Sequence, residues 1–265
     1  MADDFGMHPA VNSGIVRAFL DGLLTDSNLM APCPAFSDAA ALAKAHKIPV
    51  GLHATWTNDW DLTRWQPLTQ APSLVNSDGF FRSDVADAWA HADEGEALNE
   101  LRAQYDAIEA EGIEMTHIAE HMGVDGEAGK GAKVMTALAC EKLLPYSIAC
   151  GEYNPVSPSY QWQSCLCTSG KSTNFDEVKA LLKSFLFDAA SGYHIWYVHP
   201  ADNDPSLDQQ CSPDHSAAEW ARTYRVLDLK LLLDNEVTDW IKQLGFKMVS
   251  VTAAPVQYAA ASNGH

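Results

Sequence analysis

The amino-acid sequence predicts an α/β fold, a TIM-barrel-like (β/α) barrel with seven strands and irregular geometry, whose first strand is shortened or missing. Strand-like and helix-like segments alternate along the chain, which is typical of a parallel sheet covered by helices. The 265 residues and the 47% hydrophobic content suit one barrel domain. Polar residues gather at the carboxyl ends of the predicted strands, where barrel active sites lie. We expect one domain over residues 1–252 and a flexible tail over 253–265.

The individual elements follow from hydrophobic spacing and from residues that begin or end helices. Pro9 suits a first helical turn, Val11, Ile15 and Phe19 recur at helical spacing, and Ser37 is a good N-cap. Helices are predicted over 9–23, 37–46, 95–111, 131–144, 175–190 and 216–234. Strands are predicted over 27–30, 49–53, 114–118, 146–149, 194–198 and 246–251. Long irregular segments over 55–82 and 150–173 separate some of these elements, and loops of this length are usually functional.

The charge of the chain excludes several classes of partner. A net charge of −18 and a pI of about 4.7 oppose binding to nucleic acid and to anionic membranes. The sequence has no apolar run of about 18 residues and no visible secretory signal. We therefore expect a cytoplasmic protein with no nucleic-acid partner and no membrane partner, and a homodimer is compatible with the sequence.

The six cysteines are irregularly spaced and contain no C-x-x-C pair. Reduced thiols in a cytoplasmic protein are the simplest interpretation. Cys150, Cys165, Cys167 and Cys211 fall in loop-like regions, so a structural zinc site or a loop disulfide stays open as an alternative.

Three residues from different strand ends form a ligand set for a divalent metal ion. Asp4 lies near the start, His53 ends one predicted strand, and His121 follows another. One carboxylate and two neutral imidazoles hold a catalytic metal and leave positions open for water and substrate. Zinc suits this set, and magnesium or another first-row divalent metal stays open. We predict one divalent metal ion held by Asp4, His53 and His121.

Two further residues supply general acid and base. Side chains of adjacent residues point to opposite faces of an extended strand, so Asp3 is assigned a role different from that of Asp4, as the base. His199 ends the predicted strand 194–198 and precedes Pro200. Because an imidazole titrates at about pH 6.5, we assign His199 as the acid that protonates the leaving group.

Each of these residues taken alone has a simpler explanation. An aspartate pair before a helix is often a turn or capping feature, and His53 alone can be a hydrogen-bonded core histidine. His117 is four residues before His121, the spacing of a helical metal pair, but it falls in a predicted strand. We expect His117 to support the site or to contact substrate, without binding the metal.

The tryptophans of the segment 55–82 have two interpretations. They can form a small satellite core, or a platform on which sugar rings stack. In the second interpretation Trp60 and Trp65 bind the substrate, and Arg64 and Asp61 are candidate hydrogen-bonding groups.

Seven motifs, taken together, resemble a known family. They are ADDFG at 2–6, HPAVN at 8–12, SNLM at 27–30, VGLH at 50–53, SLVNSDGFF at 73–81, the histidine segment at 116–123 and HPA at 199–201. Their order and spacing resemble the YdjC-like carbohydrate deacetylases over nearly the whole chain. The resemblance implies a (β/α) barrel and a metal-dependent hydrolase that removes acetyl groups from N-acetylated sugars such as chitooligosaccharides. By position it implies metal ligands at Asp4, His53 and His121, a catalytic aspartate at Asp3 and the late histidine at His199.

The sequence departs from the family pattern at two places. The family usually has Asp-Ser before the metal-binding histidine, where this chain has Ala119 and Glu120. Glu120 is therefore the candidate to replace the missing support of the metal. The family also has an apolar strand before its aspartate pair, whereas only Met1 and Ala2 precede Asp3 here. We expect the pair to be less firmly held than in relatives, and metal occupancy to be weak.

The leading functional prediction is a metal-dependent hydrolase that deacetylates an N-acetylated, chitooligosaccharide-like saccharide. Metal-activated water attacks the acetyl carbonyl, Asp3 takes up a proton, and His199 protonates the leaving amine. One alternative is a metal-dependent hydrolase of an unrelated amide or ester. Another is a non-catalytic binding protein on the same scaffold.

Overall fold

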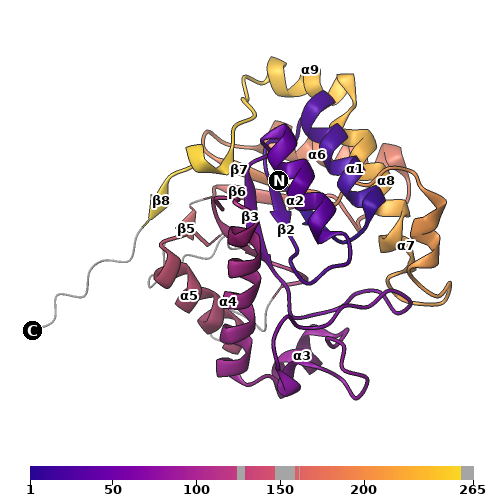
Figure 1. Cartoon of the computed structure of the whole chain (residues 1–265). Coiled ribbons are helices and arrows are strands. Elements are labelled where there is room, and N and C mark those ends of the chain that lie inside the picture. Colours follow the sequence, from indigo (N-terminus) through magenta and orange to yellow (C-terminus); the bar gives the residue numbers. More distant parts are fainter. Residues whose placement is uncertain (124–128, 147–158, 161, 258–265) are drawn as a thin grey trace, which may run out of the picture.

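The computed structural model describes residues 1–123, 129–146, 159–160 and 162–257 (Figure 1). Its helices are α1 (Pro9–Asp21), α2 (Phe36–His46), α3 (Val85–His91), α4 (Glu94–Ala110), α5 (Lys130–Lys142), α6 (Phe175–Asp188), α7 (Ala218–Ala221), α8 (Thr223–Leu232) and α9 (Asn235–Gln243). Its strands are β1 (Ala2–Phe5), β2 (Ser27–Leu29), β3 (Val50–Ala54), β4 (Ile118–Glu120), β5 (Ser159–Tyr160), β6 (Ser164–Cys167), β7 (His194–Tyr197) and β8 (Val256–Gln257). Short 3-10 helices are η1 (Pro72–Leu74), η2 (Pro205–Gln209) and η3 (Val251–Ala253).

Parallel strands with helices around them make this an α/β fold. The main sheet is parallel in the order β1-β2-β3-β4, and β6 pairs with β7 in parallel. The Asp3 N–H donates to Val198 O at 2.9 Å and the Val198 N–H to Met1 O at 3.0 Å, which places β1 beside the end of β7. A single parallel bridge joins Ile118 to Tyr146. The described strands form no closed sheet, so the barrel stays a prediction.

The opening aspartate pair lies on a strand of its own. β1 is buried along its whole length and pairs in parallel with β2. The Ala2 N–H donates to Asp26 O at 2.9 Å, and Asp3 and Asp4 are only 8% and 1% exposed. The first strand, which was expected to be shortened or missing, is therefore present with four residues and carries the aspartate pair. The strand was not predicted from the sequence because two adjacent acidic residues do not have the apolar pattern of a buried strand. The expectation that the pair is less firmly held than in relatives stays a prediction.

Most predicted elements form close to their expected places. α1, α2, α4, α5 and α6 coincide with predicted helices, and β2, β3 and β7 with predicted strands. The strand expected over 114–118 lies later, because its regular pairing with β3 begins at Ile118. The helix expected over 216–234 is broken at Arg222 into α7 and α8. The strand expected over 246–251 is wrong, since the chain there forms no strand.

Other elements were missed or fall outside the described residues. α3, α9 and β6 were not predicted, and β6 lies inside the segment 150–173 that reads as a loop. Of the strand expected over 146–149, Tyr146 forms a bridge and 147–149 lie outside the described residues. Residues 253–257 contribute to η3 and to β8, which pairs with β5, so regular structure continues past the predicted domain end. Residues 258–265 lie outside the description.

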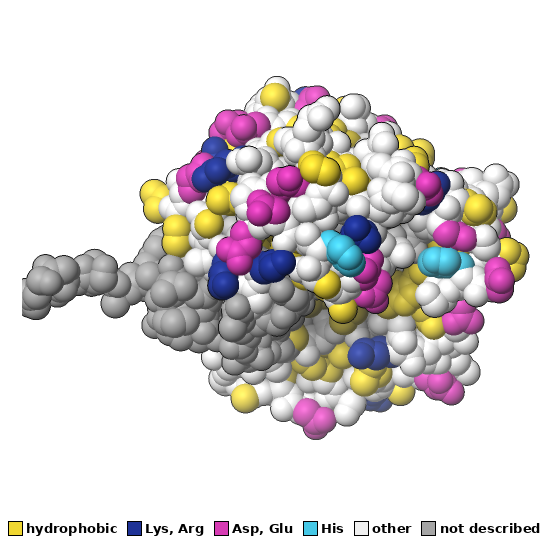
Figure 2. Space-filling model, turned by 90° about the horizontal axis from the view of Figure 1, so that it is seen from below, with side chains coloured by type: hydrophobic (Ala, Val, Ile, Leu, Met, Phe, Trp, Pro, Cys, Tyr) yellow, Lys and Arg dark blue, Asp and Glu magenta, His cyan; other side chains and the backbone are white. Residues whose placement is uncertain are grey.

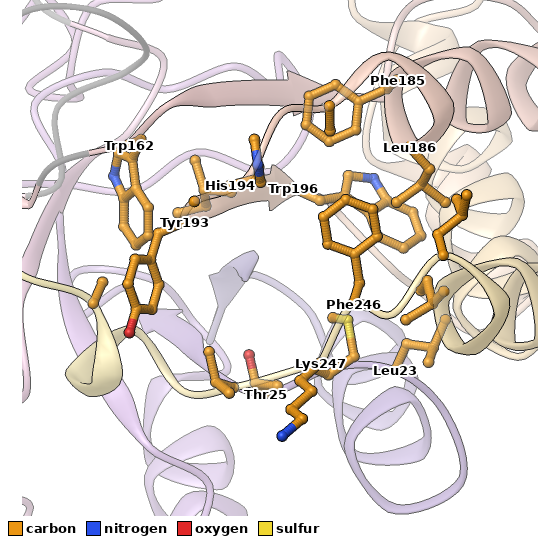
Figure 3. A pocket seen from close by; sticks show the side chains of 18 of the residues that line it. Leu23, Thr25, Trp162, Phe185, Leu186, Tyr193, His194, Trp196, Phe246 and Lys247 are labelled. Atoms are coloured by element: carbon orange, nitrogen blue, oxygen red, sulfur yellow. The ribbon is translucent and has the colours of Figure 1, made fainter.

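The amino ends of the strands border an apolar cavity of about 560 Å³ (Figure 3). The His194 ring lies edge-on between Phe185 and Phe246 in this cavity wall. Its nitrogens are hydrogen-bonded to Ser164 Oγ at 2.7 Å and to Ala190 O at 2.9 Å. With both nitrogens engaged, this histidine contributes packing, and the polar site lies at the carboxyl ends of the strands.

The cysteines differ from the simplest expectation. Cys165 is disulfide-bonded, whereas Cys33, Cys167 and Cys211 are free thiols. The interpretation of all six as reduced thiols is therefore wrong for Cys165.

The surface agrees with the acidic composition. On the face shown in Figure 2, Lys and Arg side chains are scattered among acidic and apolar ones. Within the part of the chain that the structure describes, no helix is both long enough and apolar enough to cross a membrane.

A substitution at Gly51 tests how tightly β3 packs against the His117 ring. A Cβ atom at this position would lie 2.5 Å from Nε2 of the His117 ring. We expect Gly51→Ala to lower the free energy of unfolding by about 1–3 kcal/mol in urea titrations. In the double variant Gly51→Ala/His117→Ala the ring is gone, so the loss should be smaller than the sum of the two single losses. Additive losses would contradict the proposed contact.

Candidate active site and metal centre

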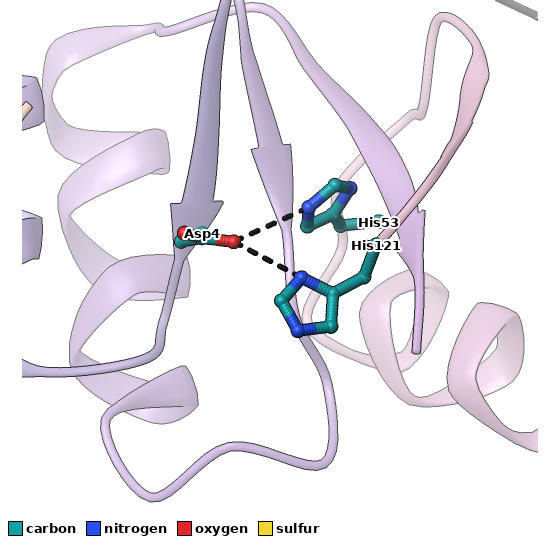
Figure 4. Close-up of side chains that lie close together, drawn as sticks. All are labelled: Asp4, His53 and His121. Atoms are coloured by element: carbon teal, nitrogen blue, oxygen red, sulfur yellow. Dashed lines mark ion pairs between the residues drawn. The ribbon is translucent and has the colours of Figure 1, made fainter. Parts of the chain in front are cut away.

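The three predicted metal ligands converge at one point (Figure 4). Asp4 comes from β1, His53 from β3, and His121 follows β4 directly. Asp4 Oδ1 lies 3.3 Å from His53 Nε2 and 3.2 Å from His121 Nδ1. One ligand atom from each residue lies within 4.8 Å of the others. Neighbouring parallel strands thus deliver these side chains to the same edge of the sheet.

The donor atoms of this cluster fit a divalent metal ion. All three side chains are buried, and within the described residues Asp4 Oδ1 has no hydrogen-bond partner. Over the same residues, the ring nitrogens turned away from Asp4, which are His53 Nδ1 and His121 Nε2, also have none. Burial of a carboxylate oxygen without a hydrogen bond costs free energy, and a cation bound between this oxygen and the two imidazoles would offset that cost. One oxygen and two nitrogen donors, with room for more ligands, match a catalytic metal site.

Arg225 compensates the charge of Asp4 from the other side. Its guanidinium is fully buried on α8 and lies 2.8 Å from Asp4 Oδ2. Burial alone would raise the pKa of Asp4, but the charge of Arg225 and the close contacts with His121 and His53 hold that pKa well below its usual value. Asp4 is therefore an anion at neutral pH, as a metal ligand must be.

Asp59 is a second carboxylate near the cluster. Its Oδ1 lies 3.6 Å from His121 Nε2, on the side of the ring away from Asp4. Burial lowers the pKa of His121, yet contacts with Asp4 and Asp59 raise it overall to about 10 in the metal-free protein. Metal binding must displace that proton, because only neutral imidazole is a ligand. The sequence analysis missed Asp59, whose only signal is its place in the tryptophan segment.

Backbone geometry brings both opening aspartates to the same pocket. Asp4 has φ of 70°, in the left-handed region, and the register of β1 against β2 is irregular between Ala2 and Phe5. This irregularity breaks the alternation of side chains, so Asp3 and Asp4 both line the pocket. The expectation that the two carboxylates must face apart is therefore wrong. A non-glycine residue at positive φ stores about 1–3 kcal/mol of strain, which the surrounding contacts must offset.

A buried hydrogen-bond chain fixes the Asp3 carboxylate. Asn28 Nδ2 donates to Asp3 Oδ1 at 2.5 Å, and Asn28 Oδ1 is bonded to His117 Nε2 at 2.6 Å. The other ring nitrogen of His117 is bonded to Thr116 Oγ1 at 2.8 Å. Burial lowers the pKa of His117 to about 4, so this ring is neutral. His117 thus supports Asp3 through Asn28, and it does not line the pocket.

His199 stands across the pocket from Asp3, with 3.7 Å between His199 Nε2 and Asp3 Oδ2. Ser169 Oγ is bonded to His199 Nδ1 at 2.7 Å and donates to Asp228 Oδ2. Asp228 also accepts from the His199 N–H at 2.8 Å. Trp220 packs edge-on against the ring at 5.3 Å between centroids. Ser169 and Asp228 were missed, because they lie in an irregular segment and inside an apolar helix.

The charge state of His199 follows from its neighbours. Burial lowers its pKa, but a hydrogen bond with Cys167 and the charges of Asp4 and Asp3 raise it overall to about 9. The ring is therefore protonated at neutral pH in the metal-free protein, and it has a proton to donate.

The pocket has a volume of about 550 Å³. Its lining includes Asp3, Asp4, Asp59, Glu120, His121, Met122, Cys167, Tyr197, His199, Trp220 and Arg225. This volume suits a small-molecule ligand, and Trp220 supplies a large aromatic surface.

The residues predicted to bind substrate lie elsewhere. Trp60 and Trp65 are 1% and 2% exposed, and the Trp65 ring packs 6.3 Å from that of His121. Arg225 lies over Trp60 at 5.8 Å. These tryptophans therefore form a wall behind the metal cluster, as in the satellite-core interpretation. Arg64 pairs with Asp78 and is not among the pocket residues. Sugar binding by this set stays a prediction.

Glu120 has a different neighbour from the one expected. It lines the pocket, and its carboxyl group is hydrogen-bonded to Tyr146. Burial raises the pKa of Glu120 to about 7. Nothing in its described contacts supports His121, so the idea that Glu120 replaces the family aspartate gains no support.

The raised pKa of His199 predicts a pH-dependent stability of the metal-free protein. The folded-state pKa is about 9, against about 6.5 for an unfolded chain. The stabilisation is therefore complete below about pH 6.5 and is lost as the pH rises through 9, by up to roughly 3 kcal/mol. Urea titrations at pH 6 and pH 9 would measure this loss, and His199→Asn should reduce it. An equal pH dependence in both proteins would contradict the assignment.

The ion pair between Arg225 and Asp4 leads to a prediction about stability. Loss of the arginine should destabilise the protein, and a bound metal ion should restore part of the lost stability. We expect Arg225→Met to destabilise the metal-free protein by about 3–5 kcal/mol, because it leaves the buried Asp4 carboxylate unpaired. A bound divalent cation replaces part of the missing charge, so zinc should raise the melting temperature of the variant more than that of the parent. Arg64→Met removes an exposed ion pair and should cost at most about 1 kcal/mol. Similar losses for the two variants would contradict the role of Arg225.

The chain is similar in sequence to known proteins named carbohydrate deacetylase. A carbohydrate deacetylase of Brevibacillus brevis is 29% identical, over 94% of this chain and 96% of its own length. A carbohydrate deacetylase of Geobacillus stearothermophilus is 41% identical in a match that covers 45% of this chain and 46% of that protein.

A solved structure shares the fold. A crystal structure from Enterococcus faecalis, described as that of a candidate cellobiose-phosphate cleavage protein, superposes with a TM-score of 0.76 at 26% identity. The match covers 94% of this chain and 95% of that chain. The family model described as YdjC-like protein matches residues 1–243. The chain therefore belongs to the YdjC-like protein family.

Proposed function

We propose that this protein is a divalent-metal-dependent hydrolase that removes an acetyl group from an N-acetylated, chitooligosaccharide-like saccharide. One observation carries the proposal: the metal-ligand cluster around Asp4 opens into the pocket in which Asp3 and His199 face each other. Membership of the YdjC-like family and relatives named carbohydrate deacetylases support the substrate class.

Asp4, His53 and His121 would hold the metal ion. When bound, such an ion polarises the acetyl carbonyl and lowers the pKa of a water molecule. The protein contributes a closed, buried set of donors, and Arg225 balances the charge of the one anionic ligand.

Asp3 is the proposed general base. Asn28 engages its Oδ1, so Oδ2 is the oxygen that faces His199 across the pocket. The chain from Asn28 to His117 keeps the carboxylate from rotating. A base held in this way accepts a proton from the attacking water without first having to be oriented.

His199 is the proposed general acid. Its Nδ1 is engaged by Ser169, so Nε2 is the nitrogen available to the substrate. Asp228 anchors both the Ser169 hydroxyl and the His199 backbone N–H. The protonated ring can then donate from Nε2 to the sugar nitrogen as the amide bond breaks, which makes the amine a better leaving group.

The pocket favours a neutral substrate with an apolar face. Asp3, Asp59 and Glu120 surround it with acidic groups, which oppose an anionic ligand. Trp220 is the larger of two half-buried aromatic residues in the lining, the other being Tyr197, and aromatic rings are suited to the apolar faces of pyranoses. We therefore assign sugar stacking to Trp220, in place of the buried Trp60 and Trp65.

Release of acetate from N-acetylglucosamine oligomers tests the proposal. We expect the zinc-loaded or magnesium-loaded protein to release acetate, and a chelator to abolish the release. Asp3→Asn should lower kcat by about 10²–10⁴-fold while bound metal and KM change little, because it removes a base that acts in the reaction step.

The negative outcomes separate the alternatives. No acetate from any acetylated sugar, with the metal confirmed as bound, would refute the deacetylase. Turnover of another amide or ester in an acyl-substrate panel would then point to the unrelated hydrolase. Binding of saccharide that Asp3→Asn and His199→Ala leave intact, without turnover, would point to the binding protein.

A further inference from the structure

A second cluster of metal-ligand residues lies away from Asp4. One ligand atom each from Asp61, Cys211 and His215 lie within 4.8 Å of one another. Asp61 belongs to the tryptophan segment after β3, whereas Cys211 and His215 come from the segment between η2 and α7. Three donor types from two distant segments therefore meet at one place.

Hydrogen bonds hold these two segments together around the cluster. The Asp61 carboxylate accepts from the Ser212 N–H at 2.9 Å and from the Ser212 hydroxyl at 2.5 Å. The backbone N–H groups of Leu62 and Thr63 both donate to Gln210 O, at 3.1 and 3.4 Å. The donors are thus positioned by backbone contacts, before any ion binds.

The charge states of the donors suit a metal that can displace a thiol proton. Hydrogen bonds from Ser212 hold the pKa of Asp61 below its usual value, so it is a carboxylate at neutral pH. Burial raises the pKa of Cys211 to about 11, while the Asp61 N–H acts in the opposite direction as a donor to the sulfur. A metal ion deprotonates a coordinating thiol outright.

A simpler role for these residues is a hydrogen-bonded junction without metal. His215 Nδ1 accepts from the Ala217 N–H at 3.1 Å, which caps the turn before α7. A hydrogen-bonded junction without a metal ion does not need a thiol, however. Cys211 is 4% exposed, and its sulfur lies beside a carboxylate and an imidazole.

We propose that Asp61, Cys211 and His215 form a second metal site that takes a zinc-like divalent ion in a structural role. Mixed sulfur, nitrogen and oxygen donors favour zinc over magnesium, which prefers oxygen alone. The ion clamps the segment that carries Asp59 to the segment that leads to Trp220, and both residues line the active-site pocket. The proposal is independent of the deacetylase assignment.

Cobalt substitution distinguishes this site from the one around Asp4, because only the second site contains sulfur. We expect one equivalent of Co²⁺ in the His53→Ala variant, whose first site is broken, to give a sulfur-to-cobalt charge-transfer band in the near ultraviolet. Cys211→Ser in the same background should abolish the band. Cys140→Ser removes an exposed thiol outside the cluster and should leave the band unchanged.

A second measurement covers variants that fold poorly. Zinc at about 100 times its Kd should raise the melting temperature of the His53→Ala protein by roughly 5 °C or more, and magnesium at the same concentration should not. Asp61→Asn and His215→Ala should each weaken zinc binding at least tenfold. Absence of the band at full cobalt loading, or its persistence in Cys211→Ser, would overturn the proposal.

Discussion

The buried carboxylate of Asp4 is the constraint on which the rest of the site depends. An isolated anion in the protein interior is too costly to persist, so the fold must bring positive or polarisable groups to it. Arg225 from α8 and the two histidines from β3 and the end of β4 meet that need. The parallel sheet supplies the convergence, because neighbouring strands end at the same edge. The strained backbone at Asp4 is retained because it turns this carboxylate into the centre of that group.

A second consequence is that different hydrogen-bond chains support the residues proposed for catalysis and those proposed for metal binding, although Asp3 and Asp4 are adjacent. Asp3 is held through Asn28 and His117, and His199 through Ser169 and Asp228. Neither chain passes through a metal ligand. Removal or exchange of an ion would therefore leave the proposed base and the proposed acid supported by the protein. The close approach of β3 to the His117 ring shows that one of these supports is part of the packed core.

The sequence was sufficient to predict the residues whose position follows from local pattern. His53 lies near the end of β3 and His121 follows β4, so the strand pattern places these two together, whereas the strand that carries Asp4 was not recognised. The sequence could not predict Arg225 or Asp228, because a charge inside an apolar helix looks the same whether it faces solvent or a buried partner.

Two further differences have the same physical origin. The sequence allowed two interpretations of Trp60 and Trp65, a small core or a platform for a ligand. Only the tertiary packing shows that they lie behind His121. The segment 246–251 has the apolar content of a strand, yet it packs beside α6 and α9 without a strand partner. The hydrophobic content of a segment indicates that it will be buried, whereas a neighbouring strand is needed before it forms a strand.

The charges around the pocket suggest why Arg225 faces Asp4 and not one of the other acids. In the proposed function Arg225 would neutralise the one anionic ligand, Asp4, so that a bound ion would keep more of its charge for polarising water and an acetyl carbonyl. Asp3 and Asp59 also line the pocket, and their charges would offset part of the charge of the ion. The pocket as a whole approaches neutrality, while the positive charge stays concentrated where the carbonyl must bind. If Arg225 paired with a carboxylate other than Asp4, the positive charge would be less concentrated at the place where the carbonyl must bind.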